Sequence, residues 1–235
     1  HVEAGAEHDG VDLDHLAGLR DDRVGRLAGS GHALNEATSQ RWLDENPAKR
    51  FIFDQLYGDL LAQGSGRRVL DVGGGLTALS PRLADNNDYT LIDPLVHEAG
   101  GALEWVASPA SGIGWRREDW LKCEELEDFD ILVANDIFPN VDQRLALFID
   151  WARPKCRQIR LALTFYNTPR WYHTQRTDCE EQLYLLAFDG ERTRAALAPV
   201  KEHVEGWAPE LFDANTGSPY ANGRQVVLAT IRGEA

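Results

Sequence analysis

The chain has 235 residues, which is enough for one sizeable α/β domain with a helical extension but tight for two full domains. Its 38 acidic residues outnumber the 24 basic ones, and the net charge of −14 argues against a nucleic-acid partner, because such affinity depends on neutralising phosphates. Three widely spaced cysteines include no C-x-x-C pair and predict neither a disulfide framework nor a zinc site. No apolar run reaches membrane-spanning length, so we expect a cytoplasmic protein without a membrane contact.

Helical patterns come first along the chain. Apolar residues over Val11–Leu27 recur at a loosely helical spacing, and Gly29-Ser30-Gly31 then breaks the pattern. Two more helices are expected over Ala33–Leu43 and Ala48–Leu61. Asn46-Pro47 is expected to open the second of these, as its cap and its first helical residue.

A glycine-rich break, Gly64-Ser65-Gly66, separates this helical region from the first predicted strand. We therefore divide the chain into a helical extension over 1–64 and a main domain over 65–235. The extension is interpreted as a lid or an oligomerisation arm more than as an independent core. A homodimer formed through these helices stays an open alternative.

The most informative stretch is Arg67–Pro94, RRVLDVGGGLTALSPRLADNNDYTLIDP. A buried apolar strand with Asp71 inside it stops at three consecutive glycines, Gly73, Gly74 and Gly75. Glycines allow positive φ angles and let backbone N–H groups approach a ligand without interference from Cβ. Thr77 or the Ser80-Pro81 pair can cap the helix that follows, so the turn leads into a helix N-terminus.

A second strand over Tyr89–Ile92 ends in another acid, Asp93, which lies 22 residues after Asp71. An acid at that distance is well placed to hydrogen-bond the ribose hydroxyls of a nucleotide in a βαβ unit. Gly73-x-Gly75-x-x-Ala78 also matches the dinucleotide fingerprint formally. The residues alone thus predict a nucleotide or nucleoside cofactor without deciding which one.

Further strands alternate with helical stretches, which predicts a mainly parallel sheet covered on both faces. A third strand is expected just before Trp115–Trp120, WRREDW. The later strands are expected over Phe129–Asn135, Leu161–Phe165 and Gln225–Ile231. Between the last two lie an aromatic and polar loop, Tyr166–His173, and a long helix over Asp178–Leu197 that Gly190 can interrupt.

The pattern D-V-G-G-G-L-T over 71–77 resembles the first motif of class I S-adenosylmethionine-dependent methyltransferases, with Thr77 in place of the third glycine. A carboxylate beside the cofactor suits a ligand with an ammonium and a sulfonium, and it would repel a pyrophosphate. The resemblance covers Phe51 to Arg232. It implies a Rossmann-like, mainly parallel seven-stranded sheet with an antiparallel last strand, and S-adenosylmethionine as the cofactor, converted to S-adenosylhomocysteine.

The same resemblance implies a cofactor site in three parts. Asp71 with Gly73, Gly74 and Gly75 would hold the methionine end, and Asp93 followed by Pro94 the ribose. Asp119 would accept a hydrogen bond from the adenine amino group, and Trp120 would cover the ring. Asn135 would border the transferred methyl group.

The acceptor is expected over the ends of the fourth and fifth strands, because ligands of open α/β sheets bind at those carboxyl ends. The candidate substrate residues are Asp136, Phe138, Asn140, Tyr166, Trp171 and Tyr172. Asn135–Phe138 faintly resembles the Asn-Pro-Pro-Tyr signature of amino-methylating enzymes but lacks both prolines, so N- and O-methylation stay open.

Methyl transfer from a sulfonium is an in-line displacement in which the protein aligns the two reactants. His173 is a candidate general base for a hydroxyl acceptor, although a loop histidine is more often a solvated bystander. Asp136 is a candidate catalytic residue as a substrate partner, a metal ligand or a turn former. Metal-dependent relatives need an Asp-Asn pair after the fifth strand, where this chain has Tyr166-Asn167, so we predict no metal.

We therefore predict a methyltransferase that acts on a small molecule in specialised metabolism. The first alternative is an NAD(P)-dependent oxidoreductase that uses the same glycines, and Asp71 counts against it. The second is a non-catalytic module that binds S-adenosylmethionine and regulates a partner through the helical arm. A protein methyltransferase that recognises a basic peptide fits the acidic charge but has no motif behind it.

Overall fold

The computed structural model describes residues 22–28, 34–175, 182–213 and 223–235. Its main sheet has six strands, which are β1 (Arg68–Val72), β2 (Asp88–Ile92), β3 (Gly114–Arg116), β4 (Phe129–Asn135), β5 (Cys156–Tyr166) and β8 (Arg224–Arg232). Their order is β3-β2-β1-β4-β5-β8. All neighbours are parallel except β5 and β8, which confirms the predicted parallel sheet with a reversed last strand.

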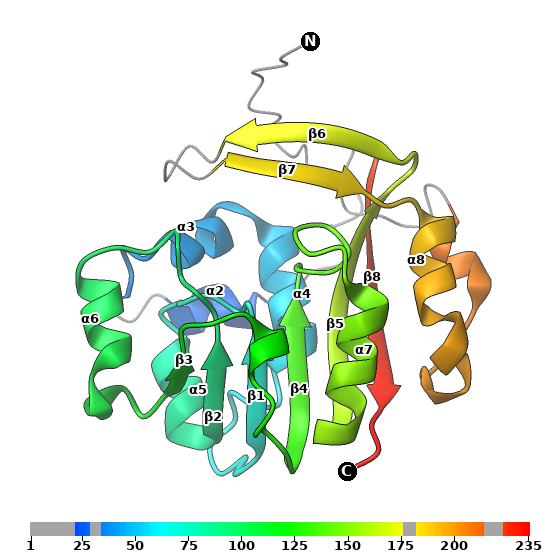
Figure 1. Ribbon diagram of the computed structural model, residues 1–235. Coiled ribbons are helices and arrows are strands. Elements are labelled where there is room, and N and C mark those ends of the chain that lie inside the picture. The colour runs from blue at the N-terminus through cyan, green and yellow to red at the C-terminus, as the bar shows by residue number, and fades with distance from the viewer. Residues whose placement is uncertain (1–21, 29–33, 176–181, 214–222) are drawn as a thin grey trace.

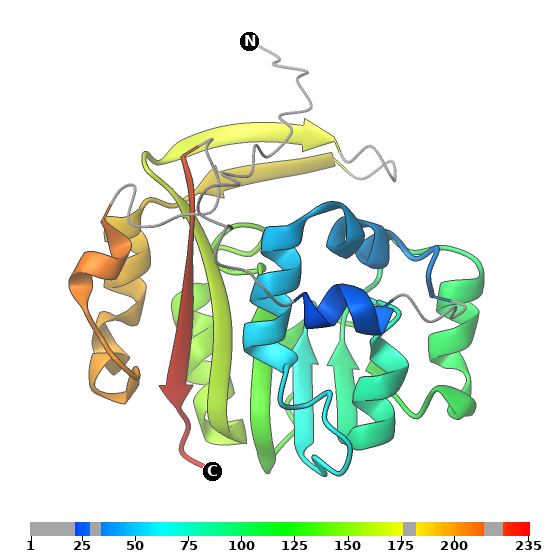
Figure 2. The ribbon, with the colours of Figure 1, turned by 180° about the vertical axis from the view of Figure 1, so that it is seen from behind.

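Helices cover both faces of this sheet (Figures 1 and 2). The α-helices are α2 (Arg23–Ala28), α3 (Thr38–Glu45), α4 (Pro47–Tyr57), α5 (Ser80–Asn86), α6 (Gly101–Ala107), α7 (Leu145–Ala152) and α8 (Gly190–Leu197). Short 3₁₀ turns are η1 (Pro109–Ser111), η2 (Trp120–Lys122), η3 (Arg153–Lys155), η4 (Ala198–His203) and η5 (Pro209–Phe212). None of the helices in these described parts is long and apolar enough to span a bilayer.

The two faces of the sheet have separate apolar cores, because successive side chains of a strand point in opposite directions. Val69 of β1 packs in one core with residues of α2, α4, α5 and α6. Leu70 and Val72 pack in the other, with residues of α7, η2 and η4. Figure 2 shows α2 and α4 in front of the first face, and Figure 1 shows α7 in front of the second. Asp71 shares the face of Val69, which is the face that the N-terminal helices cover.

The described part of the helical extension packs on the sheet. Val24 of α2 and Ile52 of α4 belong to the same core as Val69. Asn46 caps α4 as predicted, with its side chain accepting from the N–H groups of Ala48 and Lys49. The stretch 11–21 of the first predicted helix and the break at 29–31 lie outside the described residues. The division at residue 64 stays a prediction.

Two predictions about the segment after β5 were wrong. The end of the expected aromatic loop belongs to β6 (Arg170–Gln175), and the first described part of the expected long helix forms β7 (Gln182–Ala187). The expected helix is confirmed only from Gly190 on, as α8, and its residues 178–181 lie outside the described residues. The hairpin is a separate two-stranded sheet, so the main sheet has six described strands and not seven. Leucine and alanine in QLYLLA favour a helix weakly, and pairing with the aromatic strand β6 overrides that preference.

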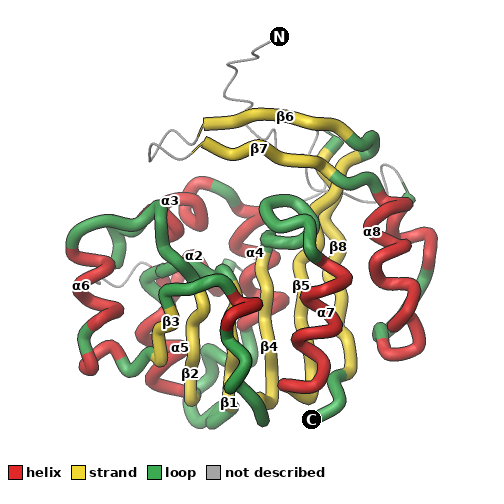
Figure 3. Tube along the Cα trace, viewed as in Figure 1, coloured by secondary structure: helices red, strands yellow, loops and turns green. Residues whose placement is uncertain are grey.

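The carboxyl ends of β1, β2 and β4 meet at one edge of the sheet. Figures 1 and 3 show α3 and the β6–β7 hairpin above this edge, and the C-terminus at the opposite edge. Ligands of open α/β sheets bind outside the carboxyl ends of the strands. The fold therefore places the glycine turn and the polar residues after β4 under two covering elements.

Candidate active site

The glycine turn that follows β1 is tightly packed from two sides. Gly73 and Gly75 have φ angles of 71° and 65°, in the left-handed region that favours glycine. A Cβ at Gly73 would lie 2.6 Å from Cδ1 of Ile137, and one at Gly75 would collide with the hydroxyl of Ser39. The glycines are therefore needed for the backbone angles and for the close approach of these two side chains.

Asp93 ties the glycine turn to the end of β2. One carboxylate oxygen accepts from the N–H of Gly75 at 3.0 Å, and the other from the N–H of Leu95 at 2.7 Å. Burial raises the pKa of Asp93, while these two N–H groups and His97 oppose the rise. Asp93 and the exposed Pro94 thus lie at the predicted edge, and each Asp93 oxygen keeps one lone pair for a further donor.

Asp71 lies beneath the glycine turn. Its Oδ2 accepts from the hydroxyl of Tyr89 at 2.6 Å, and a Cβ at Gly74 would collide with its carboxylate. Asp71 is 1% exposed. Burial raises its pKa to about 7, and the hydroxyls of Tyr89 and Tyr57 limit that rise. In this conformation Asp71 reaches no surface, and the glycine turn packs directly on its carboxylate.

Helix α3 is fastened over the turn by the loop after β2. Glu98 accepts from the N–H groups of the first two residues of α3 at 3.0 and 3.1 Å, and so caps the helix from another element. Ser39 Oγ lies 3.0 Å from Nε2 of His97. Gln40 accepts from the N–H of Ala78, just beyond the turn, at 2.8 Å. The start of α3 thus contacts both flanks of the glycine turn.

The predicted adenine pair is divided between surface and core. Asp119 is paired with Arg144 at 2.7 Å, and that guanidinium lowers the pKa of the carboxyl. Trp120 is 4% exposed and donates from its indole N–H to Asp142 at 3.0 Å. Its ring packs edge-on against Phe138, Phe148 and Trp151. Asp119 remains accessible, whereas Trp120 is a core residue without a free ring face for stacking.

Asp136 follows β4 in the left-handed conformation, with φ at 59°. Its two oxygens accept from the hydroxyl of Thr164 and from the guanidinium of Arg224, each at 2.5 Å. Burial alone would raise the pKa of Asp136, but Arg224, Lys49 and Thr164 hold it below its ordinary value. Asp136 is therefore an ionised, paired carboxylate near neutral pH and a weak candidate for a general base.

Three of the predicted substrate residues meet beside Asp136. The hydroxyl of Tyr172 donates to Oδ1 of Asn140 at 3.1 Å, and the rings of Tyr172 and Tyr166 lie 6.2 Å apart, edge to face. The guanidinium of Arg170 lies over both tyrosine rings, at 4.9 and 5.3 Å. Strand β6 thereby brings an aromatic wall to the end of β4.

The neighbours of Tyr172 in β6 face away from this wall, because strand residues alternate between faces. The ring of His173 stacks on Tyr184 of β7 at 4.4 Å, and Trp171 is 75% exposed. The structure therefore does not bring His173 or Trp171 to the predicted site.

The two remaining predicted site residues, Phe138 and Asn135, differ in burial. Phe138 is 1% exposed and stacks on Phe148 in the core, so it supports the loop after β4 from below. Asn135 is partly exposed, pairs with Ala162 of β5 and directly precedes Asp136. Asn135 thus stays at the candidate site, and Phe138 does not.

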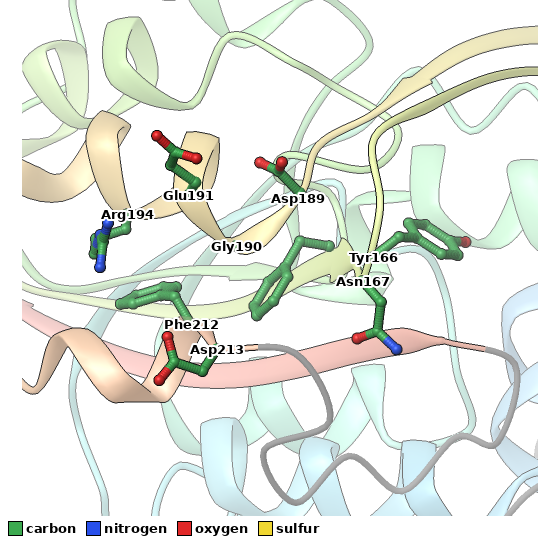
Figure 4. Close-up of a pocket in the computed structure, with 9 residues that line it drawn as sticks. Tyr166, Asn167, Asp189, Gly190, Glu191, Arg194, Phe212 and Asp213 are labelled. Atoms are coloured by element: carbon green, nitrogen blue, oxygen red, sulfur yellow. The ribbon is translucent and has the colours of Figure 1, made fainter.

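A separate hollow of about 290 Å³ lies between the end of β5, the start of α8 and η5. Its lining consists of Phe165, Tyr166, Asn167, Asp189, Gly190, Glu191, Arg194, Phe212 and Asp213. Figure 4 shows the ring of Tyr166 pointing away from the other labelled side chains. No residue of the glycine turn lines this hollow, so it is distinct from the site above β1 and β4.

Several residues that shape the site were not predicted. Tyr89 lies on the same face as Asp71, because Val69 of β1 pairs with Tyr89 of β2. That register could have been inferred once the two strands were aligned. Arg224 begins the last strand and reaches Asp136 across 88 residues, and the sequence around it carries no signal for this pairing. Ser39 and Ile137 carried none either.

Several solved structures of similar shape are methyltransferases. A 1,6-didemethyltoxoflavin-N1-methyltransferase from Burkholderia thailandensis, with its substrate and S-adenosylhomocysteine bound, is 14% identical with a TM-score of 0.52, over 83% of this chain and 81% of that one. The N-terminal domain of EvdMO1 with S-adenosylhomocysteine bound is 16% identical with a TM-score of 0.50, over 80% of each chain. An S-adenosylmethionine-dependent methyltransferase from Clostridium acetobutylicum is 10% identical with a TM-score of 0.50, over 79% of this chain and 91% of that one.

At sequence level, no family model and no curated protein matches the chain. The structural similarity at such low identity concerns the fold. The chain has the fold of class I S-adenosylmethionine-dependent methyltransferases.

Proposed function

We propose that the protein is an S-adenosylmethionine-dependent methyltransferase with a small-molecule acceptor. The observation that carries this proposal is the pair of buried carboxylates at the glycine turn, Asp71 beneath it and Asp93 beside it. Two carboxylates next to the glycine turn, at the edge of the sheet where ligands bind, favour a cationic ligand and disfavour a diphosphate. The bound S-adenosylhomocysteine in similar folds supports the same cofactor.

Each part of the turn has a role in this proposal. Gly73 and Gly75 supply the left-handed backbone angles of the turn, and the second lone pairs of Asp93 would accept from the ribose hydroxyls. Asp71 would supply negative charge from below for the amino acid end. The cofactor supplies the activated methyl group, so the protein has to bind and align the two reactants.

The acceptor would lie between Asp136, Asn140 and Tyr172, which border the carboxyl end of β4. Asp136 is held ionised by Arg224 and so does not take a proton readily near neutral pH. An amine acceptor would therefore have to arrive neutral, and a hydroxyl acceptor would need a base other than Asp136 or His173. A small molecule fits because two elements, α3 and the β6–β7 hairpin, cover the edge of the sheet (Figure 1).

Labelled methyl transfer tests the proposal. The protein is incubated with methyl-labelled S-adenosylmethionine and a panel of small amines, phenols and carboxylic acids, and a crystal is grown with S-adenosylhomocysteine in parallel. We expect the product nucleoside above the glycine turn and label in at least one acceptor. A bound nucleoside without label transfer to any small molecule would favour the regulatory module, and label in a basic peptide alone would favour a protein methyltransferase.

A further inference from the structure

Two phenols and one carboxylate form a closed cluster under the glycine turn. Tyr57 comes from α4, Asp71 from β1 and Tyr89 from β2, and their exposed fractions are 1%, 1% and 3%. The hydroxyl of Tyr89 donates to Asp71, and the ring of Tyr57 stacks on Phe53 in the core. The cluster thus joins the helical extension to the two strands that flank the turn.

No cationic side chain in the described parts of the chain lies beside the Asp71 carboxylate. Among the described residues, Oδ1 of Asp71 makes no hydrogen bond within standard limits, although the Tyr57 hydroxyl is close enough to favour the charged form. The groups facing Asp71 are Tyr57 from α4, Tyr89 from β2 and Asp93 after β2, while Val133 of β4 is apolar. A carboxylate buried among neutral and negative groups favours its protonated form.

We propose that Asp71, held by Tyr57 and Tyr89, is a buried counter-ion that is protonated in the empty protein in slightly acidic solution and ionises when the cationic cofactor binds. This inference rests on the proposed function. The step balances as the loss of one proton from the Asp71 carboxyl to solvent for each cofactor bound. The carboxylate left behind neutralises part of the cofactor's positive charge through the thin glycine turn.

The sign of the pH dependence follows from the cluster. Burial raises the pKa of Asp71 to about 7, so below that pH the carboxyl is neutral and attracts no cation. Affinity for S-adenosylmethionine therefore rises as the pH rises through this value. Methylthioadenosine lacks the ammonium and the sulfonium, so its affinity should not change with the ionisation of Asp71.

Calorimetric titration at several pH values, in two buffers of different ionisation enthalpy, measures affinity and proton release together. Between about pH 6 and about pH 8 we expect the Kd of S-adenosylmethionine to fall roughly tenfold, with up to one proton released on the acid side. The Kd of methylthioadenosine should stay constant over the same range.

The variant Tyr89→Phe removes a donor that favours the charged form. We expect the midpoint of its pH profile to move to higher pH, with affinity recovering towards that of the parent in alkaline buffer. Tyr184→Phe is the matched control, because Tyr184 is 72% exposed on the outer face of the hairpin. Tyr57→Phe is the second variant and should move the midpoint in the same direction.

The outcomes separate this inference from the proposed function. Tight binding of S-adenosylmethionine without pH dependence or proton release would overturn the counter-ion role of Asp71 and leave the methyltransferase proposal standing. No binding of either nucleoside at any pH would overturn the proposed function itself. The proton count on the unmodified protein decides the inference even where a tyrosine variant does not fold.

Discussion

Asp71, which is buried, and Asp136, which is partly exposed, lie at the carboxyl ends of neighbouring strands, and their electrostatic surroundings are opposite. Asp71 accepts from a neutral phenol, and burial raises its pKa to about 7. Asp136 accepts from the guanidinium of Arg224, which with Lys49 and Thr164 holds its pKa below the ordinary value. The comparison shows that burial and the charge of the partner together set the charge of a carboxylate. The protein thus has an adjustable anion under the turn and a fixed ion pair beside the aromatic wall.

The largest expected effect comes from a substitution that removes the charge of Asp71. Asp71→Asn should stabilise the ligand-free protein at about pH 8 by up to about 4 kcal/mol, the equivalent of raising a carboxyl pKa from 3.8 to about 7. The reason is that the folded protein binds a proton more tightly than the unfolded chain, so its stability falls as pH rises from about 4 to about 7. Urea unfolding at two pH values measures the difference.

The same substitution should weaken the binding of S-adenosylmethionine, so stability and affinity move in opposite directions. Asp88→Asn is the control, since Asp88 is exposed at the start of β2. If Asp71→Asn lost stability at alkaline pH, Asp71 would be a structural anion and not a counter-ion for a ligand.

The second prediction breaks the ion pair. Arg224→Met removes the guanidinium that is hydrogen-bonded to the Asp136 carboxylate and leaves Lys49 as the remaining cation near it. The change should destabilise the fold by about 2–3 kcal/mol, somewhat less than for a fully buried pair because Asp136 is partly exposed. The loss should shrink in acid, because the pair contributes only where Asp136 is ionised and is lost as pH falls through its lowered pKa. Chemical unfolding of the variant and the parent at neutral and acidic pH measures this difference in the free energy of unfolding.

Arg232→Met, at the exposed far end of β8, is the comparison variant and should stay near the parent in stability. Equal stability of Arg224→Met and the parent at neutral pH would show that Arg224 contributes little to holding Asp136.

The third prediction concerns the ribose assignment. Asp93→Ala removes an acceptor with two backbone hydrogen bonds and should weaken S-adenosylmethionine binding by roughly tenfold or more, since a charged acceptor contributes about 1.5–3 kcal/mol. Glu104→Ala, on the exposed surface of α6, serves as control. Unchanged affinity by calorimetry would refute the ribose role, and a lowered melting temperature alone would leave Asp93 with a structural role at the turn.

The smallest expected effects compare neighbours in β6. Tyr172→Phe loses the hydrogen bond to Asn140 and should lower kcat/KM for the acceptor by about threefold to tenfold, the equivalent of about 0.5–1.5 kcal/mol. His173→Ala should change it less than about twofold, because His173 stacks on Tyr184 on the opposite face. Steady-state kinetics gives both values. A large loss with His173→Ala and none with Tyr172→Phe would reverse the assignment of the two faces.

The fold could be predicted where local patterns determine it. The apolar run that ends in three glycines and the Asn46-Pro47 helix start appear as expected. The reversed direction of the last strand, which the family resemblance implied, is also confirmed. Strand β7 could not be predicted, because its leucines and alanine favour a helix until β6 pairs with them. The seven-stranded sheet was expected from the family resemblance, and the main sheet has six described strands.

The candidate site was predictable in position but not in charge. The glycine motif located Asp71 and Asp93, and the ends of β4 and β5 located Asp136, Asn140 and Tyr166. The protonation of these acids depends on partners such as Tyr57 and Arg224, which lie far from them in sequence. No local pattern marks such a partner, because only the folded chain brings it within reach.

Competition calorimetry between S-adenosylmethionine and NADPH tests most directly whether the carboxylates at the glycine turn select a cationic nucleoside. We predict that S-adenosylmethionine binds one site per chain at about pH 8 and that excess NADPH neither binds there nor displaces it. A dinucleotide that binds this turn and displaces S-adenosylmethionine would contradict the account.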